Sequence, residues 1–362
     1  MNATALVLLT CLGAPPEPLT VVKSEPDAAL NAKFRLKDGW VGGDGAFSVA
    51  LSDKRFLWLF SDTWVGTVRD GTRKDVKMVN NTVAVQDGTG ADATFAFAVQ
   101  EGAKGEARAI FTPPDGKGWF WQFAGHVADD TLHVFLPRFE KAGDGAFGFK
   151  ALDMWLGTVE KPDADPLKWK PKYTKVPFAN FDEKRKVSFG SAVLTVGDHA
   201  YVYGYEERQT RFFPARKLLV ARVAKDKLLS FDAWRFYANG EWKPDMKDAT
   251  AQIDALATEF SVSYLPGLKR YALVYTENGL SERVVGRFAA APEGPWSDPV
   301  LLYTCPEMKK DKKVFSYAAK AHPHLATGDE LVISYVVNAH DLGPVINNAE
   351  LYWPTFVRVR LK

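Results

Sequence analysis

The sequence has 362 residues, of which 46% are hydrophobic and 13% aromatic. A chain of this length can form one large all-β domain or two domains of ordinary size. Its 46 basic and 44 acidic residues are well mixed and leave a net charge of +2, so the basic surface of a nucleic-acid-binding protein is not indicated.

The N-terminal segment Ala5–Leu12 is apolar but too short to span a bilayer. It resembles the hydrophobic region of a signal peptide, although no basic residues precede it, and Cys11 gives it a partial likeness to a bacterial lipobox. Removal of this segment would leave Cys305 without a disulfide partner. We therefore expect residues 1–18 to be a signal peptide or lipoprotein signal with a short linker, and the protein to be exported (periplasmic, extracellular or lipid-anchored). The alternative is a frayed terminus.

The stretch Gly39–Gly66 predicts two strands, Ala46–Leu51 and Arg55–Phe60, joined by a polar turn. Pairing about this turn brings Asp44 and Asp62 to the same open end of the hairpin. Two carboxylates this close raise one pKa, and glycosidases use such pairs as acid and base. The alternative is that one aspartate begins a strand and the other caps a turn.

This hairpin recurs four more times along the chain. The copies are Phe120–Phe139, Val187–Glu207, Thr258–Asn278 and Ala319–Asn338. Their second strands begin near residues 56, 132, 201, 271 and 331, so successive copies lie 60 to 76 residues apart. Each copy has a short alternating strand, a turn rich in glycine and aspartate, and a strongly apolar strand.

A tryptophan follows three of the hairpins and marks the start of an outer strand: Trp169, Trp234 and Trp296. A third strand lies between hairpin and tryptophan, as in Leu218–Val223, so each unit has about four strands. We therefore predict an all-β fold, a five-bladed β-propeller with four-stranded blades, as a single domain over residues 30–362. Because an open blade leaves an unpaired edge, Phe356–Leu361 or Lys33–Leu36 should close the ring.

In a propeller the innermost strands line a central channel, so residues at equivalent hairpin ends meet at one mouth. The residues at those positions are Asp44, Asp62, Gln122 or His126, Arg138, Ser188 or Ser191, Glu206, Glu259, Glu277, His322 and Asn338. Carboxylates that converge from separate blades are what acid–base chemistry on a sugar requires.

Several of these residues have a second interpretation. His126 could be a buried channel histidine, and Asn80 and Asn81 could make turns rather than bind sugar hydroxyls. Trp64, Trp119 and Trp121 could pack between blades rather than stack on sugars. The spacing of His322 and His324 is poor for one metal, so we expect no metal site and no cofactor, beyond an ion or water in the channel.

The segments GWVGGDGAFSVAL and FLWLFSDTWVG, with the later AHP and GPW tokens, resemble a bacterial propeller family catalogued as domain of unknown function 4185. Some of its relatives are grouped with endo-D-arabinanases, and it is distantly similar to the five-bladed glycoside hydrolase families 43, 62 and 117. The resemblance covers most of Gly39–Val359. It implies that Asp44 matches a first-blade catalytic aspartate, Glu259 a later glutamate, and Asp62 the second aspartate of the opening motif.

We therefore expect an exported, monomeric glycoside hydrolase that acts on a furanoside-type or related polysaccharide or oligosaccharide. Asp44 would be base or nucleophile, Glu259 the general acid, and Asp62 the group that tunes their pKa values. The expected substrate-binding residues are Asn81, His126, Glu206, His322, Trp64 and Arg138. The alternatives are a non-catalytic carbohydrate-binding propeller and an interaction scaffold.

Overall fold

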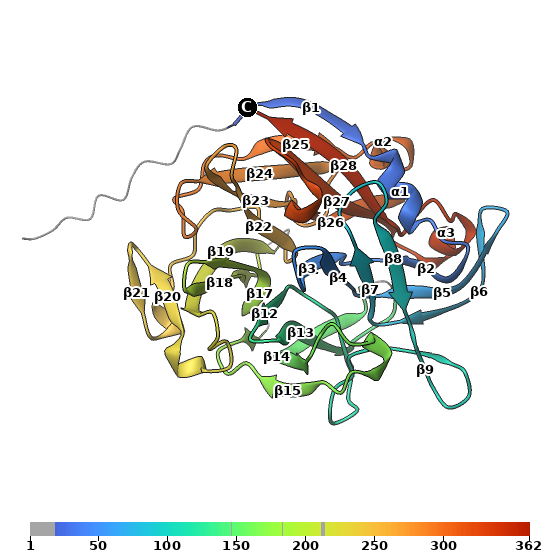
Figure 1. Ribbon diagram of the computed structural model, residues 1–362, viewed down its shortest axis with the longest axis horizontal. Helices are drawn as coiled ribbons and strands as arrows, with labels where there is room; N and C mark the ends of the chain where they lie inside the picture. The colour runs from blue at the N-terminus through green and yellow to red at the C-terminus, as the bar shows by residue number, and fades with distance from the viewer. Residues whose placement is uncertain (1–18, 146, 183, 211–213) are drawn as a thin grey trace, which may run out of the picture.

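The computed structural model describes residues 19–145, 147–182, 184–210 and 214–362 (Figure 1). The predicted signal segment, with Cys11, lies outside these residues. Five antiparallel sheets of at least four strands contain most of the strand residues of the described chain. No described helix is both long and apolar enough to cross a membrane.

The first three of these sheets follow one another along the chain. Blade 1 contains β3 (Phe47–Ala50), β4 (Arg55–Phe60), β7 (Thr82–Asp87) and β8 (Thr94–Ala98). Blade 2 contains β11 (Trp119–Phe120), β12 (Gly125–Ala128), β13 (Thr131–Lys141), β14 (Phe149–Glu160) and β15 (Lys172–Lys175). Blade 3 contains β16 (Asn180–Phe181), β17 (Arg185–Val196), β18 (His199–Arg208), β19 (Ala215–Ala224), β20 (Arg235–Ala238) and β21 (Glu241–Lys243).

The last two sheets complete the ring. Blade 4 contains β22 (Phe260–Leu265), β23 (Arg270–Thr276), β24 (Arg283–Ala289) and β25 (Val300–Thr304). Blade 5 contains β26 (Val314–Ala321), β27 (Glu330–Ala339), β28 (Pro354–Leu361) and β1 (Val21–Pro26).

The remaining elements decorate these blades. A three-stranded sheet of β2 (Asp38–Gly43), β5 (Thr63–Arg69) and β6 (Thr72–Val79) branches from blade 1, and β9 (Gln100–Glu101) pairs with β10 (Ala107–Arg108). The helices are α1 (Ala28–Phe34), α2 (Glu307–Lys310) and α3 (Leu342–Asn347). Four 3-10 turns cover Pro166–Lys168, Phe231–Ala233, Met246–Asp248 and Pro323–Leu325.

The innermost strands contact one another in sequence around a central axis. Strand β3 contacts β12, β12 contacts β17, β17 contacts β22, and β22 contacts β26. A 2.8 Å hydrogen bond between Ser48 Oγ and His322 Nδ1 joins the fifth blade back to the first. The predicted all-β propeller is therefore confirmed, and the described residues contain five blade-sized sheets, as the five hairpins indicated.

The ring closes through both ends of the chain. Strand β28 lies between β27 and β1, so the N-terminal strand forms the outer edge of the blade that ends the chain (Figure 1). The prediction that Lys33–Leu36 forms a closing strand is wrong, because Ala28–Phe34 is helix α1, capped by the Asp27 side chain on the Leu30 amide. The other predicted strand, Phe356–Leu361, is confirmed as part of β28, and Val21–Pro26 pairs with it at the edge of the blade.

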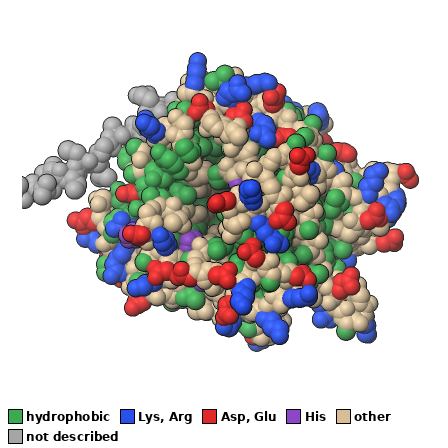
Figure 2. Space-filling model, in the orientation of Figure 1, with side chains coloured by type: hydrophobic (Ala, Val, Ile, Leu, Met, Phe, Trp, Pro, Cys, Tyr) green, Lys and Arg blue, Asp and Glu red, His purple; other side chains and the backbone are tan. Residues whose placement is uncertain are grey.

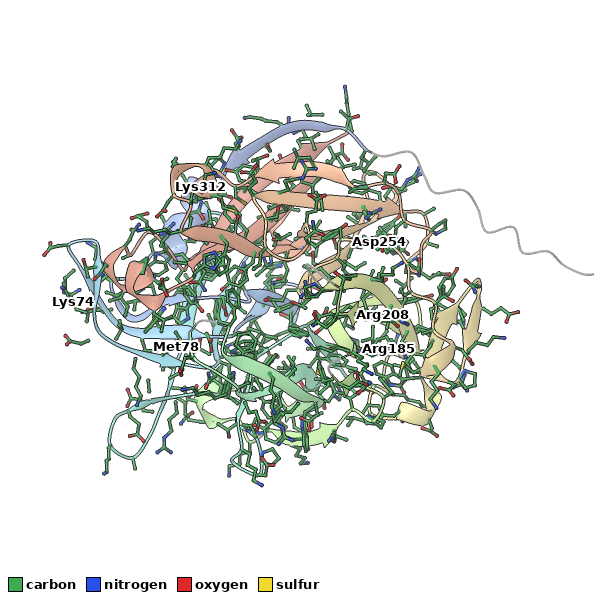
Figure 3. All side chains as sticks on the ribbon, turned by 180° about the vertical axis from the view of Figure 1, so that it is seen from behind. Lys74, Met78, Arg185, Arg208, Asp254 and Lys312 are labelled. Atoms are coloured by element: carbon green, nitrogen blue, oxygen red, sulfur yellow. The ribbon has the colours of Figure 1, made fainter. Side chains whose placement is uncertain are left out.

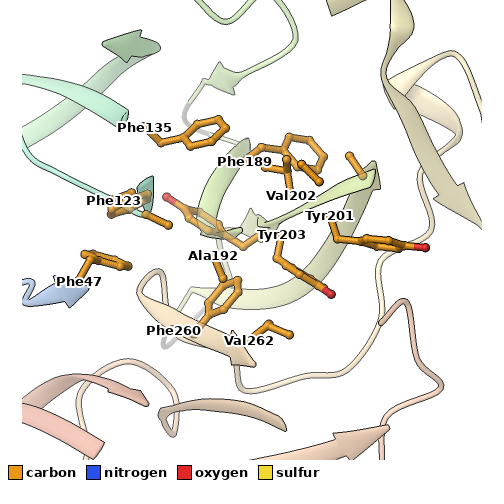
Figure 4. Packing of buried hydrophobic residues seen from close by; sticks show 14 of the residues in the cluster. Phe47, Phe123, Phe135, Phe189, Ala192, Tyr201, Val202, Tyr203, Phe260 and Val262 are labelled. Carbon is orange, nitrogen blue, oxygen red and sulfur yellow. The ribbon is translucent and has the colours of Figure 1, made fainter. Parts of the chain in front are cut away.

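Apolar side chains from neighbouring blades pack against one another near the axis. Figure 4 shows Phe47, Phe123 and Ala192, from blades 1 to 3, facing Phe260 and Val262 of blade 4. Close packing of this kind fixes the distances between the inner strands, and with them the distances between the polar residues at their ends.

We predict that Phe34→Ala will lower the free energy of unfolding by about 3–5 kcal/mol, the usual cost of deleting a fully buried phenylalanine side chain. Phe34 is fully buried, and its ring contacts Trp58 of blade 1 and Phe356 of blade 5, so it links the closing segment to both sides of the ring. Urea unfolding measures the loss. Phe147→Ala, at a residue that is 53% exposed, is the control and should change stability by less than about 0.5 kcal/mol. Equal losses would contradict this account of closure.

Candidate active site

The open end of the first hairpin holds two aspartates, as the sequence predicted. The Asp44 amide donates to the Asp62 carbonyl oxygen at 3.1 Å, and the Ser61 amide donates to the Asp44 carbonyl oxygen at 3.0 Å. Gly45, with φ +76°, makes the turn between these contacts and the start of β3. The two carboxylates thus leave the hairpin at the same end of the channel.

The carboxyl group of Asp44 is buried and held on one side only. Its Oδ2 accepts hydrogen bonds from the Tyr317 hydroxyl at 2.6 Å and the Tyr352 hydroxyl at 3.0 Å. Its Oδ1 is buried and has no hydrogen-bond partner in the structure. Burial, and then the negative charges of Asp62 and Glu259, raise the pKa of Asp44 well above its usual range, against the two tyrosine donors.

Asp62 has a more polar environment. Its Oδ1 accepts from Trp121 Nε1 at 2.8 Å and from Asn80 Nδ2 at 3.1 Å. Burial raises the pKa of Asp62 to about 6, and these two hydrogen bonds oppose the shift. Asp44 and Asp62 are therefore neighbouring carboxyl groups whose pKa values are both raised and whose ionisations influence each other.

Glu259, directly before β22, brings a third carboxylate to this cluster. It accepts a hydrogen bond from Lys320 Nζ at 2.8 Å. The Lys320 side chain is buried, and its ammonium group lies 4.2 Å from the centre of the Phe47 ring. Burial lowers the pKa of Lys320, whereas Glu259 and then Asp44 raise it. The lysine thus lies in the electrostatic field of carboxylates from blades 1 and 4.

A bulge in β26 explains how Tyr317 and Lys320 reach the same cluster. Alternate residues of a regular strand face one side, so residues three apart would face opposite sides. The register of β26 shifts between Tyr317 and Lys320, and Ala318 has φ +59°. The bulge re-aims both side chains toward the channel mouth, as bulges beside active sites commonly do.

A pocket of about 380 Å³ opens beside Asp62. Its lining is aromatic and polar: Asp62, Met78, Asn80, Trp119, Trp121, Lys141, Gly143, Asp144, Gly145, Gly148, Phe149, Asn338, Leu342 and Tyr352. Met78 is marked in Figure 3, which views the molecule from behind relative to Figure 1. Aromatic faces beside hydrogen-bonding groups are suited to sugar rings.

Two of the predicted substrate-binding residues are buried near this site. Asn81 is fully buried, and its amide bonds the backbone of Phe111 and Phe120. The neighbouring Asn80 reaches Asp62 instead. Trp64 is 5% exposed and packs edge-on against the Tyr352 ring, so it helps to hold that ring in place.

The two predicted histidines both lie toward the ends of their inner strands that are away from Asp44. His126 pairs with His133 beside the β12–β13 turn, and its Nε2 lies 2.8 Å from the Lys225 carbonyl oxygen. His322 follows β26, and its ring nitrogens each lie 2.8 Å from a serine hydroxyl, that of Ser48 or Ser334. Burial lowers the pKa of His322 well below its usual range. The prediction that His322 lies at the mouth with Asp44 is wrong, because it lies past the far end of β26.

The predicted Arg138 and Glu206 are already paired within their blades. Arg138 makes two hydrogen bonds, of 2.8 and 2.7 Å, to the carboxylate of Asp153. Glu206 accepts from Arg185 at 2.8 and 2.6 Å and also from Arg208 (Figure 3). Burial opposes ionisation of Glu206, but the two arginines lower its pKa. Charges of both signs are likewise interspersed on the face shown in Figure 2.

Sequence reasoning missed Tyr317, Lys320 and Tyr352. The predicted fifth hairpin begins at Ala319, whereas β26 begins at Val314, so Tyr317 lies before the predicted strand. Lys320 lies within the predicted hairpin, and the bulge that aims it at the channel mouth is not visible in the sequence pattern. The aromatic and basic residues in VFSYAAK were the available signal. Tyr352 lies in a loop outside the hairpin repeat. No group of three or more histidine, cysteine, aspartate or glutamate side chains suited to a metal occurs among the described residues.

The family model described as "Domain of unknown function (DUF5005)" matches residues 27–361. This chain belongs to the DUF5005 family. The resemblance to domain of unknown function 4185 is therefore wrong. The shared glycine–aspartate and tryptophan tokens mark a propeller of this general kind and do not separate the two families. No curated protein matches the sequence.

Solved structures share the fold of this DUF5005 protein. A protein from Bacteroides ovatus ATCC 8483, provisionally assigned as a hydrolase, is 20% identical with a TM-score of 0.73, over 93% of this chain and 90% of that one. The GH43_1 enzyme from Xanthomonas citri complexed with xylose has a TM-score of 0.49 and 13% identity over 92% of each chain. The α-L-arabinofuranosidase PaAbf62A from Podospora anserina has 0.44 and 9%, over 90% and 92%. At 20% identity the likeness to the Bacteroides ovatus protein concerns the fold alone, and no conclusion is drawn from the two weaker likenesses.

We predict that Asp62→Asn will gain stability relative to the wild type as the pH rises from 4 to 7. A raised pKa favours folding while the group is protonated, and that contribution is lost as the pH rises through about 6. The asparagine Oδ1 can still accept from Trp121 and Asn80. Urea unfolding across this range measures the difference.

Asp153→Asn is the control for this experiment. Neighbouring donors lower the pKa of Asp153 against the effect of burial, so its ionisation lies below this pH window and its deficit should stay constant across it. A constant difference between Asp62→Asn and the wild type would contradict the raised pKa of Asp62.

Proposed function

We propose that this DUF5005 protein is a glycoside hydrolase whose reaction takes place at the channel mouth beside Asp44. The observation that supports this is the buried Asp44 carboxyl group, with one oxygen held by two tyrosines and the other unpartnered, next to carboxylates from the same and another blade. Structural carboxylates in proteins are normally paired with cations or donors on both oxygens. The unpartnered Oδ1 of Asp44 is therefore available to interact with a substrate.

Asp44 is the base or nucleophile in this proposal. The tyrosines fix Oδ2, so Oδ1 is the atom that would attack an anomeric carbon or take a proton from water. The raised pKa makes Asp44 more basic than an ordinary aspartate, which favours a role as general base. Asp62 contributes through its charge, because its ionisation raises the pKa of Asp44.

Glu259 is the partner that protonates the leaving oxygen. In the structure it forms an ion pair with Lys320, so the ammonium group 2.8 Å away carries the nearest proton. Transfer of that proton from Lys320 to Glu259, and from Glu259 to the glycosidic oxygen, leaves a neutral lysine. The lowered pKa of Lys320 makes this transfer easier than for an exposed lysine.

The pocket beside Asp62 supports a saccharide as the substrate. Trp119 and Trp121 provide aromatic faces, and Asn80 and Asn338 provide amide groups near the carboxylates. We propose a furanoside-type or related polysaccharide as the class, and release of reducing ends from a panel of polysaccharides tests it. A panel that is bound but never cleaved would favour a carbohydrate-binding propeller.

Asp44→Asn should reduce turnover by roughly 10²–10⁴-fold if Asp44 is a general base, and by more if it is the nucleophile. Asparagine keeps the shape and the acceptor for the two tyrosines but cannot take up the proton. Asp144→Asn is the control, because Asp144 lines the same pocket with a side chain that is 98% exposed. Near-full activity of Asp44→Asn on the true substrate would contradict the proposal.

Glu259→Gln should lose activity on substrates with poor leaving groups and keep it on activated aryl glycosides, which depart with little protonation. Glu277→Gln, at the same end of blade 4 and paired with Arg283 at 2.7 Å, is the control and should keep both activities. If Asp44→Asn rather than Glu259→Gln spares the activated substrates, the acid and base roles are exchanged.

Export of the protein is also a proposal, supported by the apolar segment Ala5–Leu12 and the prolines that follow it. N-terminal sequencing of material from the medium or periplasm should show a chain that begins after residue 10. A chain in the cytoplasm that retains Met1 would contradict export.

A further inference from the structure

Arg73, near the start of β6, is a buried cation without a carboxylate partner. It is 1% exposed, and no ion pair is recorded for it among the described residues. Its donors go to backbone carbonyl oxygens: Nε to Val41 at 2.8 Å, Nη1 to Val345 at 2.6 Å, and Nη2 to Leu351 at 2.6 Å. Burial of a guanidinium group is costly, so these contacts need an explanation beyond general stability.

Two of the carbonyl groups that Arg73 binds, those of Val345 and Leu351, belong to the segment that leads into Tyr352. Val345 lies in α3, Leu351 directly precedes Tyr352, and the Arg73 guanidinium lies 5.1 Å from the centre of the Trp353 ring, the next residue. The Ala349 amide also donates to the Gly71 carbonyl oxygen at 2.8 Å. The loop from α3 to β28 is thus fastened to the β5–β6 hairpin on both sides of Tyr352.

Gly42 in the opening motif permits this arrangement. A Cβ atom at Gly42 would lie 2.6 Å from the Tyr352 carbonyl oxygen and 2.7 Å from Arg73 Nη2. Gly42 also has φ +134°, which side chains rarely adopt. The glycine therefore lets the first-blade backbone approach both the tyrosine and the arginine that holds it.

The backbone of Tyr352 itself is strained. It has φ +67°, in the left-handed region that is unfavourable for a bulky residue and persists only where surrounding contacts enforce it. Its amide donates to the Val337 carbonyl oxygen at 2.8 Å, and its hydroxyl donates to Asp44. The strained conformation thus coincides with contact between the tyrosine and the candidate catalytic aspartate.

We propose that Arg73 is a positioning residue that acts through Tyr352: by binding the Leu351 carbonyl group, it holds the Tyr352 hydroxyl on Oδ2 of Asp44. This inference deepens the proposed function, because it assigns Arg73 to the orientation of the candidate base. It concerns a contact that can be measured without any substrate.

The electrostatic consequence follows from the groups that face Asp44. They come from four places in the chain: Asp62 after β4, Glu259 before β22, Tyr317 and Lys320 in β26, and Tyr352 before β28. The two tyrosine hydroxyls lower the pKa of Asp44, and the two other carboxylates raise it. Displacement of Tyr352 removes one lowering contact, so the pKa of Asp44 should rise.

The test is a carbon-13 NMR titration of the aspartate side chains in the full chain, with assignment by Asp44→Asn. Tyr352→Phe should raise the pKa of Asp44, because it removes only the hydroxyl. Arg73→Lys keeps the charge but cannot span the carbonyl groups, and it should raise the same pKa. The double variant Arg73→Lys/Tyr352→Phe should have the same Asp44 pKa as Tyr352→Phe alone, because both changes remove the same contact, that of the Tyr352 hydroxyl with Asp44. Gly42→Ala should also raise the pKa of Asp44, because the added methyl group would displace Tyr352 and Arg73.

Two controls make the same kinds of substitution away from Asp44. Tyr335→Phe removes a buried hydroxyl that donates to Glu307, and Arg287→Lys alters an arginine that donates to Tyr275 and Ser297. Neither should change the titration of Asp44. An unchanged Asp44 pKa in folded Arg73→Lys, or additive shifts in the double variant, would overturn the proposal. So would loss of folding in both Arg73→Lys and Gly42→Ala, because it would assign Arg73 to the fold.

The same variants separate this proposal from the proposed function. If the protein is a hydrolase, the acidic limb of kcat/KM should move to higher pH in Tyr352→Phe and Arg73→Lys, in step with the NMR titration. If no substrate is found but the NMR shifts occur, the positioning role stands and the hydrolase assignment fails.

Discussion

The residues around the channel mouth are arranged around one constraint: the carboxyl group of Asp44 is buried and must be stabilised there. A carboxylate out of water is stabilised only by donors and cations, and here two tyrosine hydroxyls and a nearby lysine provide them. Two further carboxylates oppose this, so the site holds more negative charge than its donors neutralise. Such a balance makes the protonation state of Asp44 responsive to small displacements of its neighbours.

Backbone strain accompanies these contacts. Ala46, Ala318 and Tyr352 all have positive φ, and each lies within two residues of Asp44 or one of its tyrosine partners, or is itself such a partner. The tight turn at Ala46 follows Asp44, the bulge at Ala318 aims Tyr317, and Tyr352 is fastened by its neighbours. Strain of this kind requires rigid surroundings, which the aromatic packing of the blades supplies.

Much of this architecture could be predicted from the sequence, because the local signals were strong. Period-two strands and tight turns indicate hairpins, and their repetition indicates blades, so the fold and the meeting of Asp44 with Asp62 followed from local chemistry. The C-terminal strand Phe356–Leu361 was also predicted, but its N-terminal partner was not, because the identity of that partner depends on pairing between the two ends of the chain.

The partners of Asp44 depend on features that local patterns do not encode. A bulge changes which residues of β26 face the channel, and a glycine in blade 1 makes room for a loop that lies about 300 residues later in the sequence. Equivalent positions in the hairpins also predicted Arg138 and Glu206 to lie at the channel mouth together with Asp44. Only the ion pairs within blades 2 and 3 show that Arg138 and Glu206 differ from Asp44 in already having charged partners.

Those ion pairs distinguish Asp44 from the buried carboxylates of blades 2 and 3. Burial opposes ionisation at Asp153, Glu206 and Glu207 as it does at Asp44, so burial does not distinguish them. The first three have arginine or lysine partners, and their pKa values are lowered; Asp44 has tyrosines and other carboxylates, and its pKa is raised. At Asp44 burial is the largest cause that raises the pKa, the two carboxylates add to it, and the tyrosine donors only partly oppose it. Cation partners within blades 2 and 3 outweigh burial at Asp153, Glu206 and Glu207, and Asp44 has no such partner. This difference in neighbours is why Asp44, rather than the acids of blades 2 and 3, is the candidate for chemistry.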